Sequence, residues 1–85
     1  MPVRLDRIAA RLPGAVVVGD GALEVRGAFQ DSRGATEGCL FCVRRGERAS
    51  GAAYVEDARA RGAVALLTDD PELARAAGLP AIVVP

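Results

Sequence analysis

The sequence predicts a small α/β domain in which helices cover a sheet that is at least partly parallel. The first observation is the order of segments after residue 38, where three short apolar runs alternate with two stretches of helical pattern. This order is typical of right-handed βαβ units. The second observation is that the runs at 63–67 and 81–84 are apolar throughout, as in strands buried on both faces. The third is length, because 85 residues correspond to one domain with a thin core.

The first half of the chain predicts one helix and a pair of strands. Apolar residues recur at helical spacing over residues 3–12, and a Pro-Gly pair ends the pattern. Residues 15–18 are an apolar run that predicts a strand, and residues 23–29 alternate between apolar and polar, as a half-exposed strand does. A glycine-rich turn signal at 19–21 separates the two runs, so they are expected to pair as a hairpin.

The second half adds boundary signals to each expected element. Residues 40–43 predict a strand, and a helix over 52–61 follows, with Ser50 as a plausible N-cap and Gly62 just beyond its end. A shorter helix is expected between the two buried runs. Its signals are an aspartate cap, a proline in the first turn and a terminating glycine, namely Asp69 or Asp70, Pro71 and Gly78.

Composition excludes several classes of function. Eleven basic and eleven acidic residues give a net charge of zero, with no basic stripe, so nucleic acid is not an expected partner. The chain has no histidine and no lysine, so it lacks the most usual general base, a P-loop lysine and a Schiff-base lysine. No apolar run is long enough to span a bilayer, and the start does not resemble a signal peptide. The expectation is therefore a cytoplasmic protein without a membrane partner.

Cys39 and Cys42 form a C-x-x-C pattern, but its context favours two ordinary reduced thiols. Redox and metal motifs of this kind begin a helix or a knuckle, whereas this pair falls on an expected strand. A spacing of three places the two side chains on opposite faces of a strand. No further cysteine or histidine completes a zinc site, so no metal is expected in this chain.

Two polar segments leave a structural and a functional interpretation open. Asp31-Ser32-Arg33 can fix a turn through local bonds, or can offer N–H groups and a hydroxyl to a polar ligand. Residues 44–48 gather three arginines around Gly46, which is either a solvated cluster or a phosphate contact, since arginine binds phosphate bidentately. The helix expected to begin near Ser50-Gly51 adds a positive dipole end nearby. Composition alone favours the structural interpretation of the first segment.

Taken together, the two segments resemble the N-terminal domain of the Mur ligases. The similarity is closest to the tripeptide synthetase branch, the UDP-N-acetylmuramoyl-L-alanyl-D-glutamate ligases, and next to the branch that adds D-alanyl-D-alanine. It covers residues 25–85 and is free of gaps from residue 31 to residue 51. The matching positions are Asp31-Ser32-Arg33, Gly38, Leu40-Phe41, Gly46, Ala58 and Gly62-Ala63. The resemblance implies a small three-layer α/β domain with a mixed, partly parallel sheet and helices on its faces.

The resemblance also implies a set of site residues. By position, the contacts to the UDP part of a muramyl-peptide substrate fall on Gln30, Ser32, Glu47, Arg48 and Ala49. Three further residues, Asp31, Arg33 and Gly46, are expected to organise the loops. No catalytic residue is expected in this chain.

The implied whole enzyme is larger than these 85 residues. Residues 1–85 are expected to be a single UDP-substrate-binding domain, and the central ATP-binding and C-terminal ligase domains are absent from the sequence. The chain alone is not expected to be catalytic. The parent enzyme, using ATP and Mg²⁺, would add an amino acid to a UDP-N-acetylmuramoyl-peptide in peptidoglycan synthesis, and its other domains would be partners of this one.

The second segment departs from the family pattern. Glu47 stands where histidine is often found, and Ser50-Gly51 where Asp-Gly is common. Cys39 and Cys42 replace other residue types. A glutamate beside a pyrophosphate would be repulsive, which motivates an alternative of another class. In this alternative, the domain is a non-enzymatic interaction or regulatory module that kept the fold without binding a nucleotide.

Overall fold

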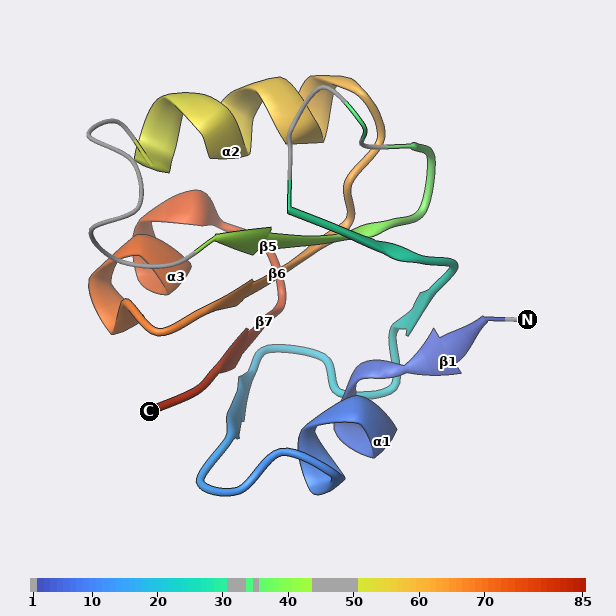
Figure 1. The fold of residues 1–85 in the computed structure, drawn as a ribbon, viewed down its shortest axis with the longest axis vertical. Helices are drawn as coiled ribbons and strands as arrows, with labels where there is room; N and C mark the ends of the chain where they lie inside the picture. The colour runs from blue at the N-terminus through green and yellow to red at the C-terminus, as the bar shows by residue number, and fades with distance from the viewer. Residues whose placement is uncertain (1, 31–33, 35, 44–50) are drawn as a thin grey trace.

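A computed structural model describes residues 2–30, 34, 36–43 and 51–85, and the fold is built from short elements (Figure 1). In chain order these are β1 (Val3–Arg4), α1 (Leu5–Ala10), β2 (Val16–Val18), β3 (Glu24–Val25), β4 (Ala28–Phe29), β5 (Leu40–Val43), α2 (Gly51–Ala60), β6 (Ala65–Thr68), α3 (Pro71–Ala77) and β7 (Ala81–Val83).

The central sheet is mixed and mostly parallel, as the sequence predicts. Its strand order is β2-β7-β6-β5-β4. The neighbours β4 and β5, β5 and β6, and β6 and β7 are parallel, whereas β2 pairs with β7 in the antiparallel direction. β6 therefore has a parallel neighbour on each side, which explains why its sequence is apolar on both faces.

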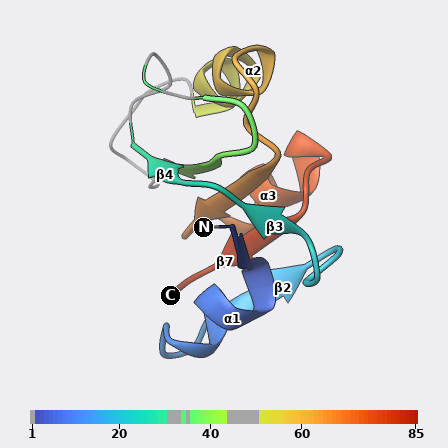
Figure 2. The same ribbon diagram turned by 90° about the vertical axis from the view of Figure 1, so that its right-hand side faces the viewer.

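Helices α2 and α3 cover one face of this sheet, and α1 lies on the other, so the domain has three layers (Figures 1 and 2). Successive strand residues alternate between two cores. In β5, Leu40 packs toward α1 and Phe41 toward α2, and in β6 Ala65 and Leu66 do the same. This is the two-residue period of a strand buried on both faces. The expected fold class is confirmed.

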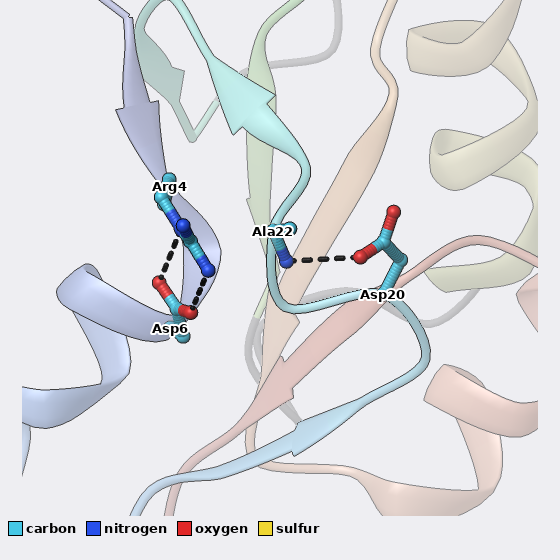
Figure 3. Close-up of polar contacts among 4 residues, drawn as sticks. All are labelled: Arg4, Asp6, Asp20 and Ala22. Carbon is cyan, nitrogen blue, oxygen red and sulfur yellow. Dashed lines mark hydrogen bonds and ion pairs between the residues drawn. The ribbon is translucent and has the colours of Figure 1, made fainter.

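A small antiparallel pair supports α1 at the margin of the domain. β1 pairs with β3 through Val3 opposite Val25 and Arg4 opposite Glu24. Arg4 donates to both carboxylate oxygens of Asp6, with Nε–Oδ1 3.1 Å and Nη2–Oδ2 2.7 Å (Figure 3). In the facing turn, the amide of Ala22 donates to Oδ1 of Asp20 at 2.9 Å (Figure 3). The pair of Arg4 and Asp6 joins the end of β1 to the first turn of α1.

The expected hairpin in the first half is wrong. The run at 16–18 forms β2 but pairs with β7, the last strand of the chain. The run at 23–29 divides into β3, which pairs with β1, and β4, which pairs with β5. The first helix is also shorter than residues 3–12, because its first two residues are extended in β1. The alternation of apolar and polar residues predicts strands but not their partners, which are distant in the sequence.

The expected elements of the second half are all present, with bounds that differ from the expected ones by at most two residues, and the signals that delimit α3 are confirmed. α3 starts at Pro71, and the carboxylate of Asp70 accepts bonds from the amides of Glu72 and Leu73. The helix ends at Gly78, whose φ of 70° is left-handed. Gly62 follows α2 with φ 115°. The expected N-cap of α2, Ser50, lies outside the described residues.

Candidate functional site

The candidate site lies at the carboxyl edge of two neighbouring parallel strands. β4 and β5 run side by side in the same direction, with Phe29 opposite Phe41. The chain therefore leaves both strands at the same edge of the sheet, at Phe29 and at Val43. The two polar segments of the sequence, 30–33 and 44–50, begin at these two exits. In open α/β sheets this edge is where ligands bind.

Gln30 is the only one of the predicted site residues that the structure describes. It follows directly on β4, and its side chain is exposed. Ser32, Glu47, Arg48 and Ala49 lie outside the described residues, as do the loop-organising Asp31, Arg33 and Gly46. The structure thus places the two ends from which the segments start, and the assignments within them stay predictions.

Phe29, the last residue of β4, lies beside this edge. Its half-buried ring packs against the core on the α2 side. A Cβ built on Gly34 would lie 3.6 Å from Cδ1 of Phe29, and one on Gly27 would lie 3.4 Å from Cε2. A side chain at either glycine would therefore touch the ring, and glycine leaves room for it both before β4 and after the first polar segment. Sequence reasoning missed this position because Phe29 reads as an ordinary core residue.

The end of the segment between β4 and β5 is fixed by backbone contacts at the amino ends of β5 and β6, on the opposite edge of the sheet. The amide of Gly38 donates to the carbonyl of Gly62 at 2.8 Å, and the amide of Val64 donates to that of Cys39 at 3.0 Å. A Cβ on Gly62 would lie 2.5 Å from Cα of Glu37. The two motif glycines therefore allow the turn before β5 and the turn after α2 to touch through their backbones.

The end of β6 contributes polar groups to the edge of the candidate site. The hydroxyl of Thr68, which is fully buried, accepts a hydrogen bond from the amide of Asp70 at 3.1 Å. Asp70 in turn caps α3. Both side chains form hydrogen bonds at the start of α3, which favours a structural role for Thr68 and Asp70. The involvement of Thr68 had no signal in the sequence beyond its place at the end of an apolar run.

The cysteines are confirmed as separate thiols on opposite faces of the sheet. Cys39 is buried toward α2, and Cys42 is half-buried toward α1. Burial, followed by the nearby Cys39, raises the pKa of the Cys42 thiol. Within the described part of the chain, no three histidine, cysteine or acidic side chains gather as a metal site. Nor does any described helix have the length and hydropathy needed to cross a bilayer.

Comparison with known proteins gives a consistent result. A family model described as "Mur ligase family, catalytic domain" matches residues 24–84. A UDP-N-acetylmuramoyl-L-alanyl-D-glutamate--2,6-diaminopimelate ligase of Streptomyces coelicolor is 45% identical over 71 residues, which is 81% of this chain and 14% of the relative. The enzyme of the same name from Agrobacterium fabrum is 52% identical over 48 residues, 56% of this chain and 10% of the relative.

A third relative, whose name does not specify the amino acid that is added, is similar to this chain as well. A UDP-N-acetylmuramyl-tripeptide synthetase of Roseiflexus is 40% identical over 62 residues, covering 73% of this chain and 12% of the relative. The chain therefore spans about a seventh or less of the length of these relatives.

Proposed function

Because the chain belongs to the Mur ligase family, we propose that it is the substrate-recognition domain of an ATP-dependent UDP-N-acetylmuramoyl-peptide ligase. In this proposal it binds the UDP part of the substrate during cytoplasmic synthesis of peptidoglycan precursors. The observation that carries the proposal is the shared exit of the two polar segments beside the parallel strands β4 and β5. We call the full-length protein the parent ligase.

The proposed contacts suit a nucleoside diphosphate. Gln30 and the hydroxyl of Ser32 would donate to and accept from the polar edge of the nucleoside. Backbone amides at 47–49 and the guanidinium of Arg48 would bind diphosphate oxygens, because arginine recognises phosphate bidentately. α2 begins at Gly51, directly after the second segment, so its positive dipole end would favour the same negative charge.

The remaining chemistry belongs to other parts of the parent ligase. ATP and Mg²⁺ would supply the activation of the substrate carboxylate as an acyl phosphate, which the amine of the incoming amino acid attacks. This chain has neither lysine nor histidine, and no metal-ligating cluster is found among its described residues, so the proposal assigns that role to the rest of the parent ligase. Its contribution is to hold the distant UDP, and that binding energy helps to orient the reacting end.

Titration with UDP tests the proposal directly. We expect added UDP to shift the amide NMR signals of residues 30–33 and 46–50, while those of α1 on the opposite side of the sheet stay in place. Weak binding is expected, since the other domains would complete the pocket. If the two segments show no shift at millimolar UDP, the proposal of UDP binding by this domain is wrong.

Two substitutions refine the test. Ser32→Ala removes one hydrogen bond to the ligand and should weaken UDP binding by about fivefold to tenfold, corresponding to roughly 1 kcal/mol. Glu47→Gln removes a negative charge near the diphosphate and should leave binding unchanged or strengthen it. The same NMR titration measures both. A Ser32→Ala variant that binds as tightly as the wild type would remove Ser32 from the site.

An interaction or regulatory module is the second candidate. It is favoured by Glu47, whose carboxylate would repel a diphosphate, and by the altered end of the second segment at Ser50-Gly51. In that case the two segments would contact a protein instead of a nucleotide. Reading the gene beyond the codon of Pro85 separates the candidates, because a downstream lysine-containing P-loop would contradict the module.

A further inference from the structure

Near the carboxyl ends of β5 and β6, the two faces of the central sheet are covered unequally. On the side of α2 and α3, Phe41 and Leu66 are almost fully buried, with exposed fractions of 1% and 0%. On the side of α1, the residues near the carboxyl ends of the strands, Cys42, Leu67 and Val84, are only half-buried although they pack against the core. Cys42 and Leu67 are direct partners across β5 and β6. The short α1 leaves this part of the sheet incompletely covered.

An open apolar groove of about 450 Å³ occupies this place. One wall is the turn after α1, with Leu12 and Pro13, and the other is formed by Leu67, Val84 and Pro85. None of these side chains carries a charge or a hydrogen-bonding group, so the groove suits an apolar surface and offers nothing to a phosphate or a metal ion.

The end of the chain forms part of the groove and is held in position. The amide of Val84 donates to the carbonyl of Thr68 at 2.9 Å, which continues the pairing of β7 beyond its last residue. A Cβ on Gly14, whose φ is 75°, would lie 2.8 Å from Cγ of Pro85. The Pro85 ring therefore rests against the backbone of Gly14. Figure 1 shows the C-terminus at the end of β7.

From this arrangement we propose that the groove, lined by Leu12, Pro13, Leu67, Val84 and Pro85, docks the part of the parent ligase that follows this domain. The inference rests on the proposed function. The chain spans 14% of the Streptomyces coelicolor relative, so most of a ligase of that size lies outside these residues. Pro85 lines the groove, so any polypeptide that follows it starts there. The segment that follows this domain is therefore the nearest candidate to fill the groove.

The position of the groove gives the docking a consequence for substrate binding. It lies near the carboxyl ends of β6 and β7, and the proposed UDP site starts at the carboxyl ends of the parallel strands β4 and β5. Both therefore belong to the same edge of the sheet. A unit docked in the groove would stand beside the UDP site and set the distance between the held nucleotide and the reacting end. Interfaces between domains of one chain are commonly large enough to include such a groove at their centre.

The test uses the full-length parent ligase with substitutions at exposed positions. Pro13→Glu places a charge on one rim of the groove, and Pro85→Glu does so on the other. Val16→Glu is the matched control, since Val16 is 59% exposed and its partner Val83 packs toward α3, on the opposite face. The readouts are hydrogen exchange of the amides around residue 12 and alkylation of Cys42, followed peptide by peptide with mass spectrometry. Exchange in β6 reports whether each variant is folded.

In both groove variants, we expect the amides around residue 12 to exchange, and Cys42 to be alkylated, several-fold faster than in the wild type. Exchange in β6 should be unchanged. Val16→Glu should match the wild type in both readouts. If folded groove variants behave as the wild type does, or if Val16→Glu accelerates both readouts equally, the docking proposal is overturned. UDP titration of the same variants keeps the two proposals apart. Loss of docking with intact UDP binding supports separate sites, and docking without any UDP binding would contradict only the proposed function.

Discussion

Gly62 shows how a single missing side chain sets the geometry at the amino ends of β5 and β6, on the edge of the sheet opposite the candidate site. It combines a φ of 115° with a backbone neighbour, because a Cβ would lie 2.5 Å from Cα and 2.9 Å from the amide nitrogen of Glu37. Backbone atoms cannot move aside as a flexible side chain can. The glycine therefore holds the turn before β5 against the end of α2, through the bond from Gly38 to its carbonyl.

We predict that Gly62→Ala lowers the free energy of unfolding by about 2–3 kcal/mol, since strain from left-handed backbone adds to the collision. Gly78→Ala is the control. Gly78 also has a positive φ of 70°, but its nearest contact would be Nη2 of Arg59 at 3.5 Å, so it should lose only about 1 kcal/mol. Urea denaturation measures both. Equal losses would show that the contact with Glu37 contributes nothing.

The ion pair between Arg4 and Asp6 predicts a pH dependence. The side-chain hydrogen bond from Arg4 is the main cause that lowers the pKa of Asp6. Because the pKa is lower in the folded state, the stabilisation is present above the ordinary pKa of a carboxyl group and is lost as the pH falls through the folded value. Both side chains are exposed, so the effect is small.

A double-mutant cycle measures this coupling. Arg4→Gln, Asp6→Asn and the double variant should show a favourable interaction between the two residues at pH 7 in urea denaturation. The interaction should weaken as the pH falls through the lowered pKa of Asp6 and vanish once the carboxyl group is protonated. A coupling that stays constant from neutral to acid pH would mean that the charge of Asp6 has no part in it.

Among the elements, α2 and α3 are joined by a directed hydrogen bond. Nη2 of Arg59 donates to the carbonyl of Ala77 at 2.6 Å, which satisfies an acceptor at the C-terminal end of α3. A positive charge there also interacts favourably with the helix dipole. The side chain thus fastens the two helices of one layer together just before Gly78 ends the second of them.

We predict that Arg59→Met, which keeps the apolar stem, lowers the free energy of unfolding by about 1 kcal/mol and speeds amide exchange in the last turn of α3. Arg75→Met is the control, because Arg75 is exposed on α3 itself. Thermal or urea unfolding gives the stability, and hydrogen exchange locates the change. If Arg75→Met has the same effect, loss of charge explains the result and the bond to Ala77 does not.

The sequence predicted elements whose signals are local. The cap at Asp70 and the glycine at 78 mark α3, and unbroken apolar runs mark β6 and β7. It did not predict the partner of β2, because strand pairing depends on which distant strand leaves an edge free, and β7 is the last strand of the chain. Turn residues between 19 and 21 look like a hairpin whether or not the flanking strands meet.

The candidate site was less predictable from the sequence than the helices and strands were. The sequence singled out the two polar segments but not their common edge, which follows from the parallel strands that end at Phe29 and Val43. The sequence could not show that the buried hydroxyl of Thr68 and the ring of Phe29 lie at this edge, since both positions depend on the order of strands in the sheet. Of the individual contacts, only the exposed position of Gln30 is described, so the rest are still predictions.

At the scale of the whole molecule, one sheet separates two cores that depend on it equally. β6 belongs to both, since Ala65 packs toward α1 and Leu66 toward α2. Leu5 of α1 and Val55 of α2 are buried at opposite sides, with exposed fractions of 0% and 3%. Both cores pack on this shared sheet, so the loss of one would expose apolar residues of the strands that carry the other. The two sides should therefore unfold together.

We predict that Leu5→Ala lowers the free energy of unfolding by about 2–5 kcal/mol, and that Val55→Ala lowers it by less, because fewer buried atoms are removed. In each variant, the slowest-exchanging amides of β6 should lose protection by the same free energy that urea denaturation measures. The agreement follows only if opening either side opens the whole domain. If Leu5→Ala speeds exchange in α1 but leaves β6 protected, α1 unfolds as a separate unit, and the sheet with α2 and α3 is stable without it.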